Sequence, residues 1–269
     1  MDSLTETLPG RAFDGTPPIA PLDARWAMRR IRLSTGVDMA FTFRPGTGLP
    51  LLFLPANRTS RRIFDFALAA LDPPNPFDVP DYRGHGESGL APAGSYALED
   101  HLDDIEDLCD ALGWERFAVV GQATGATLSL LLASRLPDRV VALAAGDVAV
   151  ALRDEVFALF LGQVQAHDQG FATEQEALEA TPFREEWAPE VARHWLATAL
   201  ARSADGRFRW RYHAPGVVET QRALSADFWP RIRVTQPTLL FQGAHCTVIG
   251  ADAMATAQRN IKQARFTHL

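Results

Sequence analysis

The 269-residue chain is predicted to be an α/β protein with a mostly parallel, doubly wound sheet of about eight strands. Short apolar segments typical of buried strands alternate with segments whose apolar residues recur every three or four positions, the spacing of amphipathic helices. The composition is that of a globular protein, because 47% of the residues are hydrophobic and 22% are charged. This balance favours a packed core over a disordered chain.

The expected strands form one antiparallel pair and one parallel set. Residues 27–33 and 39–43 alternate apolar and polar side chains around a turn at Gly36, which predicts a hairpin at the edge of the sheet. Residues 49–54 are an uninterrupted apolar run, typical of a strand that is buried on both faces of a parallel sheet. Further strands are predicted at residues 77–79, 117–120, 140–145, 238–241 and 264–269.

Helices are predicted between these strands. Residues 60–71 and 97–112 carry apolar side chains at helical spacing, and the acidic residues of the second segment are expected on its outer face. Two more helices are predicted at residues 124–136 and 251–261. Because strand and helix alternate, we expect helices on both faces of the sheet.

Two regions depart from this alternation. Residues 1–22 contain four prolines and no hydrophobic period, which predicts an extended leader. Residues 151–226 have helical patterns but no convincing buried strand. They predict a helical insertion between two core segments, 23–150 and 227–269. The helical patterns of the insertion lie at residues 155–167, 174–180 and 189–201.

Composition excludes several classes of function. The net charge is −7 and no stretch gathers enough Lys and Arg to follow a phosphate backbone, so no nucleic-acid partner is expected. The chain has no run of 18 apolar residues and no signal-peptide pattern, which predicts no membrane partner. Cys109 and Cys246 are far apart and are read as reduced thiols of a cytoplasmic protein. Neither a metal nor a cofactor is expected, because no histidine has a partner at metal-ligand spacing and no glycine-rich phosphate motif is present.

The most informative segment is residues 119–126, V-V-G-Q-A-T-G-A, which joins a predicted strand to a predicted helix. Gly121 and Gly125 lie two residues before and after Ala123. In a sharp strand-to-helix turn the central residue is driven to positive φ, and the flanking positions must be tiny so that strand and helix can approach. This is the pattern of the G-x-S-x-G nucleophile elbow, with Ala123 at the serine position.

With these residues the chain resembles the α/β-hydrolase superfamily from residue 25 to residue 269. Residues 79–89, V-P-D-Y-R-G-H-G-E-S-G, are similar to the family's P-D-x-R-G-x-G-x-S turn. Residues 51–57, L-L-F-L-P-A-N, look like its third strand and oxyanion loop, and residues 238–248 look like the strand and loop that usually supply the catalytic acid. The resemblance implies that residues 151–226 are the cap that shapes the substrate pocket.

The resemblance also implies roles for individual residues. Ala123 stands at the nucleophile position, at the base of the largest pocket, and the backbone N–H groups of Thr124 and Asn57 would form the oxyanion hole. Cys246 occupies the usual place of the acid, so Asp147, after the strand at 140–145, is the candidate acid. An aspartate that only bonds to the backbone at a strand end is the alternative for this residue.

Three tryptophans of the insertion, Trp187, Trp195 and Trp210, are candidate pocket residues, with mere packing of the cap as the alternative. The family's catalytic histidine follows the eighth strand. His245 lies on the acid loop and His268 lies inside the last expected strand, so neither is assigned as the base. The chain is therefore expected to be truncated before the base and the closing helix.

The function implied by the resemblance is that of hydrolases of small esters, lactones or similar acyl bonds, with a small apolar or acyl-type molecule as partner. With Ala123 the chain is expected to be inactive, through natural loss or through a serine-to-alanine replacement in an active enzyme. Two alternatives stay open. One is a non-catalytic protein that binds a small molecule or a partner, and the other is a cofactor-free lyase or oxygenase that uses a His/Asp pair.

Overall fold

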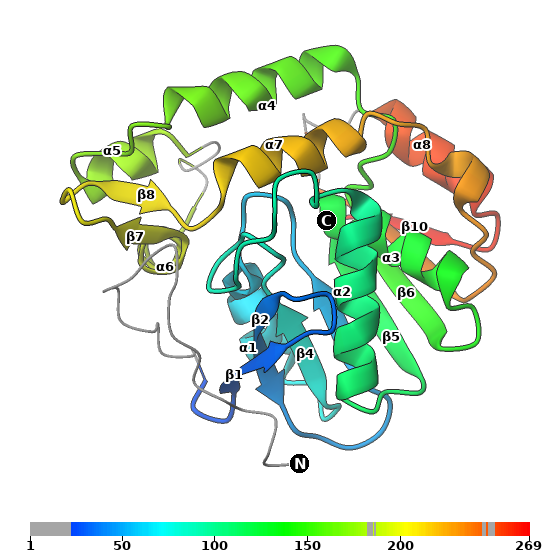
Figure 1. Cartoon of the computed structure of the whole chain (residues 1–269). Coiled ribbons are helices and arrows are strands. Elements are labelled where there is room, and N and C mark those ends of the chain that lie inside the picture. Colours follow the sequence, from blue (N-terminus) through cyan, green and yellow to red (C-terminus); the bar gives the residue numbers. More distant parts are fainter. Residues whose placement is uncertain (1–22, 182–184, 186, 244–245, 247–250) are drawn as a thin grey trace.

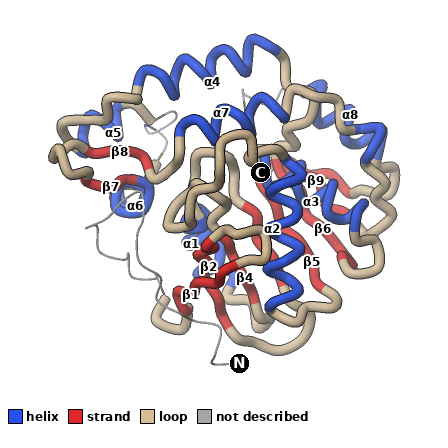
Figure 2. The backbone as a smooth tube through the Cα atoms, viewed as in Figure 1, coloured by secondary structure: helices blue, strands red, loops and turns tan. Residues whose placement is uncertain are grey.

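The structure is a computed structural model that describes residues 23–181, 185, 187–243, 246 and 251–269 (Figure 1). The expected leader, residues 1–22, and His245 lie outside the described residues. The strands form a sheet with helices packed against it, and a further group of helices lies past one end of the strands (Figure 2).

The main sheet has eight strands in the order β1-β2-β4-β3-β5-β6-β9-β10. The β1–β2 and β2–β4 pairs are antiparallel, and every other pair is parallel. This confirms the predicted edge hairpin and the mostly parallel sheet. The strands are β1 (Ala27–Arg32), β2 (Asp38–Arg44), β3 (Leu51–Leu54), β4 (Phe77–Pro80), β5 (Phe117–Gln122), β6 (Val140–Gly146), β9 (Thr238–Gln242) and β10 (Arg265–His268).

Helices cover both faces of the sheet, as the alternation of neighbouring residues on β3 shows. Leu52 and Leu54 belong to the main core together with residues of α2 (Leu98–Ala111) and α3 (Thr124–Arg135). Phe53 packs in a separate cluster with Leu68 of α1 (Asp65–Leu71). Successive side chains of a strand point to opposite faces, so the two clusters mark the two faces. The helices of the core are η2 (Arg61–Phe64), α1 (Asp65–Leu71), α2 (Leu98–Ala111), α3 (Thr124–Arg135) and α8 (Ala251–Asn260).

One expectation for α2 is wrong, because part of its polar side faces protein. Asp104 is buried and pairs with Arg83 of the P-D-Y-R-G-H-G turn at 2.7 Å. His101 is also buried, and its Nε2 lies 3.0 Å from Thr220 Oγ1. A charge pattern along one helix does not reveal which neighbour carries the opposite charge.

The described residues of 151–226 form a group of helices that lies above the sheet in Figure 1. The sequence shows no convincing buried strand in this segment, but the structure has a short antiparallel hairpin between α6 (Pro189–Ala199) and α7 (Ala214–Ala223). Each strand of the hairpin has three residues, too few to show a period of two. The sequence does not predict α7 either, because its buried side includes the non-hydrophobic residues Gly216, Thr220 and Gln221. The elements are α4 (Asp154–Ala166), α5 (Glu174–Glu179), α6 (Pro189–Ala199), β7 (Leu200–Arg202), β8 (Phe208–Trp210) and α7 (Ala214–Ala223), followed by η4 (Trp229–Arg231).

The chain that leaves β8 is hydrogen-bonded to the turn after β4. Gly86 N–H donates to the Arg211 carbonyl, and His213 N–H donates to the Gly84 carbonyl, both at 2.7 Å. His85 and Tyr212 form an isolated antiparallel bridge between these two bonds. The insertion is therefore hydrogen-bonded to the turn after β4, a part of the core that is far from residues 151 and 226 in the sequence. No helix in the described part of the chain is long and apolar enough to cross a membrane.

Candidate active site

Ala123 lies in the turn between β5 and α3 with φ 51° and ψ −111°. This is the positive φ expected for the centre of an elbow, and in a residue with a Cβ it costs about 1 kcal/mol. The Ala123 N–H donates to the Gly146 carbonyl at the end of β6, at 2.8 Å. The turn is thus held against the neighbouring strand.

The two glycines of the elbow are required by close backbone contacts. A Cβ on Gly121 would lie 2.1 Å from the Gly125 carbonyl oxygen, and a Cβ on Gly125 would lie 2.0 Å from the Leu54 carbonyl oxygen. Real Cβ atoms do not approach other atoms so closely, so only glycine fits either position without a backbone shift. The spacing read from the sequence has this steric cause.

The loop after β3 brings Asn57 to the same end of the sheet, because Leu54 pairs with Gly121. The Asn57 side-chain amide donates to the Val217 carbonyl at 3.1 Å and to Gln221 Oε1 at 3.2 Å, both in α7. The Asn57 N–H donates to no group of the described residues. Thr124 is the first residue of α3, a position whose N–H has no acceptor inside the helix. Both groups are donors without a partner in the helix or loop, as an oxyanion hole needs.

Asp147 follows β6 directly and has φ 50°. Its N–H donates to the Phe241 carbonyl at 3.0 Å, and its Oδ1 accepts from Gly243 N–H at 3.3 Å. Asp147 is also the neighbour of Gly146, whose carbonyl accepts from Ala123. The candidate acid therefore lies between the elbow and the loop after β9, where the family's acid is usually found. The bond from Gly243 N–H to the Asp147 carboxylate is what the alternative predicts, namely an aspartate that only bonds to the backbone at a strand end.

A cavity of about 460 Å³ lies between this end of the sheet and the insertion. Trp187, Trp195 and Trp210 all line it, as do Asn57 and Gln122. Ala123, expected at the base of the pocket, is not among the described residues that line this cavity, and Gln122 is the residue of the elbow that does. The remaining described lining residues are Ala56, Arg58, Thr59, Ile63, Val156, Leu159, Phe160, Gln163, His167, Ala180, Thr181, Tyr212 and Gln221.

Two residues of this region were not singled out from the sequence. Arg58 lines the cavity, and no motif distinguishes it from the other arginines of the chain. His85 is buried, with Nε2 3.0 Å from Asn57 Oδ1 and Nδ1 3.0 Å from the Arg83 carbonyl oxygen. The sequence could have pointed to His85 through its position in the turn after β4, because this turn and the loop of Asn57 lie at the same end of the sheet.

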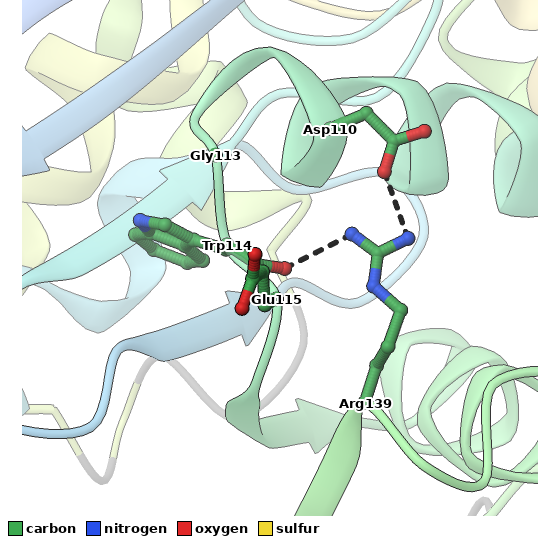
Figure 3. Close-up of a pocket in the computed structure, with 5 residues that line it drawn as sticks. All are labelled: Asp110, Gly113, Trp114, Glu115 and Arg139. Carbon is green, nitrogen blue, oxygen red and sulfur yellow. Dashed lines mark hydrogen bonds and ion pairs between the residues drawn. The ribbon is translucent and has the colours of Figure 1, made fainter.

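A second hollow lies at the opposite end of the strands, where α2 ends and β5 begins (Figure 3). Arg139 pairs there with Asp110 at 2.7 Å and donates to the Trp114 carbonyl at 3.0 Å. Because Asp110 already compensates the charge of Arg139, this hollow is not a candidate site. In the described residues no group of three His, Cys, Asp or Glu side chains could hold a metal ion.

Burial of histidine beside the site predicts a loss of stability in acid. Burial, and then the charges of His85 and Arg83, hold the pKa of His101 well below its usual value of 6.5. The unfolded chain therefore takes up a proton near pH 6.5 that the folded chain does not, so the free energy of unfolding falls as the pH drops below this value. We expect His101→Gln to flatten this dependence in urea titrations at pH 7.5, 6.5 and 5.5, by at most about 1.4 kcal/mol per pH unit.

Thr220→Val is the matched control, because it removes the hydroxyl that faces His101 and leaves the histidine in place. It should lower stability by a similar amount at all three pH values. An unchanged pH slope in His101→Gln would contradict the prediction.

Comparison with known proteins places these features in a family. Residues 50–269 match the family model described as alpha/beta hydrolase fold. The chain is 28% identical over 216 residues to the 2-(acetamidomethylene)succinate hydrolase of Mesorhizobium japonicum, which covers 80% of this chain and 77% of that protein. The crystal structure of an E-2-(acetamidomethylene)succinate hydrolase superposes with a TM-score of 0.80 at 24% identity, over 91% of this chain and 90% of the other.

An alpha/beta hydrolase from Novosphingobium aromaticivorans gives a TM-score of 0.77 at 25% identity, over 92% and 91% of the two chains. The eight-stranded sheet, the Gly-x-Ala-x-Gly elbow and the family match over residues 50–269 agree. The chain belongs to the α/β-hydrolase fold family.

Proposed function

We propose that the chain binds a small ester, lactone or similar acyl compound, and that it forms no acyl-enzyme because Ala123 occupies the nucleophile position. The observation that carries this proposal is the elbow backbone, since Ala123 keeps φ 51° between two glycines that the packing requires. A turn without any remaining link to acyl chemistry would gain from glycine at its centre, because alanine is strained there. The name of one relative, 2-(acetamidomethylene)succinate hydrolase, supports an acyl compound as the ligand.

Covalent acyl transfer needs a nucleophile and a base that activates it. Ala123 offers a methyl group, and the nearby hydroxyl of Thr124 belongs to a buried residue at the start of α3. The oxyanion donors of Asn57 and Thr124 would still polarise a bound carbonyl, and triad knockouts in other hydrolases keep about 10³- to 10⁴-fold acceleration over water. Any hydrolysis by this chain should therefore be weak and should show no burst of released alcohol.

The test is treatment with a fluorophosphonate serine-hydrolase probe, followed by peptide mass spectrometry. We expect no adduct within residues 119–127, and no burst of p-nitrophenol in the hydrolysis of p-nitrophenyl acetate. A stable adduct in this segment would contradict the proposal, because it would show that one of these residues acts as a nucleophile.

A second experiment separates a disabled hydrolase from a binding protein. Ala123→Ser is introduced into the chain, and the variant is assayed with short p-nitrophenyl esters. A rise of 10²-fold or more over the Ala123 form, on the order of what a restored nucleophile supplies, would identify a disabled hydrolase. Saturable ligand binding with no gain in hydrolysis would identify a binding protein.

A further inference from the structure

The cavity above the elbow holds one permanent positive charge and no negative charge among its described lining residues. Arg58 is the only Arg or Lys in this lining, and no Asp or Glu belongs to it. His167 adds no charge at neutral pH, since burial, and then the nearby Arg58, lower its pKa. A ligand that enters this cavity therefore meets an uncompensated cation.

The surroundings of Arg58 leave most of its hydrogen-bonding capacity unused. Its Nη1 donates to Gln163 Oε1 at 2.8 Å, and its guanidinium lies over the ring of Phe160, 4.3 Å from the centroid. Both partners come from α4 and both are neutral. A guanidinium carries five N–H donors in a planar fork, so one bond to an amide leaves room for a two-pronged acceptor.

Three buried arginines near the site are each paired with carboxylates. Arg61 pairs with Asp81 and Glu87, Arg62 with Asp65, and Arg83 with Asp104. For Arg58 the described residues provide no ion pair, and burial lowers its pKa. Arg58 is partly buried, and taking a cation out of water without an anion costs free energy, so its place in a cavity without a carboxylate fits a site that receives an anionic ligand.

The backbone holds Arg58 in place in spite of strain. Its φ is 63°, and its N–H lies 3.1 Å from Asn57 Oδ1 and 3.4 Å from His85 Nε2. Asn57 is the candidate oxyanion residue, so the cation is one residue from the place where an acyl oxygen would bind. Strained residues of this kind concentrate at ligand-binding sites.

We propose that the cavity takes a small acyl compound that carries a carboxylate, and that Arg58 binds the carboxylate while the acyl carbonyl faces the elbow. The tryptophans of the insertion supply the apolar wall along which the rest of the molecule packs. This inference rests on the proposed function, and it narrows the expected apolar or acyl-type ligand to an acyl compound with a negative charge.

The test measures binding to the Ala123 chain by calorimetry with paired probes. The monomethyl esters of succinate, glutarate and adipate each have a carboxylate at one end, and their dimethyl esters are the uncharged matches. We expect at least one monoester to bind about 10- to 100-fold more tightly than its diester, the range expected for a charge-assisted, two-pronged hydrogen bond.

Arg58→Gln should remove this preference and leave diester binding unchanged. Arg58→Lys should keep part of the preference, because an ammonium retains the charge but not the fork. Arg259→Gln, an exposed arginine of α8, is the control and should bind like the parent. Thermal unfolding of each variant shows whether the fold is intact.

The outcomes separate the two proposals. Equal binding of monoesters and diesters, or a preference that survives in a folded Arg58→Gln, would overturn the role of Arg58 and leave the proposed acyl ligand standing. Binding of neither probe set would overturn both. A covalent probe adduct at the elbow, together with a monoester preference, would overturn only the absence of acyl-enzyme chemistry.

Discussion

Gly125→Ala is expected to lower the free energy of unfolding by about 3 kcal/mol or more, which would leave little of the folded chain at moderate temperature. The added Cβ would lie 2.0 Å from the Leu54 carbonyl oxygen and 2.7 Å from that of Pro55. These are backbone atoms at the end of β3, and they cannot move away without disturbing the pairing of Leu54 with Gly121. Urea unfolding followed by circular dichroism measures the loss.

The matched control is Gly162→Ala. Gly162 lies inside α4, and a Cβ there would meet no atom within 4 Å. The same substitution should stabilise the chain by about 0.5 to 1 kcal/mol, because alanine favours the helix interior. If Gly125→Ala cost less than about 1 kcal/mol, the elbow would not be packed as described.

Arg61→Met is expected to cost about 3 to 5 kcal/mol of stability. The guanidinium is buried between Asp81 and Glu87, and both carboxylates are themselves buried. Methionine fills a similar length and leaves two negative charges without their cation. Asp81 Oδ1 also accepts from Arg61 N–H at 2.7 Å and its Oδ2 from Glu87 N–H at 2.8 Å, so some stabilisation of this carboxylate survives.

Arg25→Met provides the comparison, because the Arg25 pairs with Asp23 and Asp72 lie at the surface. Exposed ion pairs are worth about 1 kcal/mol or less, so this variant should unfold close to the parent in the same urea titration. Similar losses for the two variants would mean that the Arg61 cluster is open to water.

The elbow was predictable from sequence because its cause is local. Gly121, Ala123 and Gly125 are spaced by the geometry of a single turn, and the strand before it is a short apolar run. The strands of the core were predictable for the same reason, since burial on one or both faces leaves a period in the sequence. These features need no knowledge of distant partners.

The ligand-facing part of the site depends on partners far apart in the chain. Asn57 bonds to α7, and Arg58 meets Gln163 and Phe160 of α4, more than 100 residues further on. Whether a buried arginine is neutralised is decided by which side chains reach it, and no local pattern records this. The β7–β8 hairpin was missed because each strand has only three residues.

The hydrogen bonds between the insertion and the turn after β4 limit which segments can be exchanged between this chain and a relative. If residues 151–226 were replaced by the corresponding segment of a relative, the new backbone would have to remake the bonds from Gly86 to Arg211 and from His213 to Gly84, and the bond from Asn57 to Gln221 would need the same side chain. These bonds cross the boundaries that the sequence suggests for a module. The unit that can be exchanged, in a laboratory or in evolution, is the insertion together with the loop of Asn57 and the turn that contains His85.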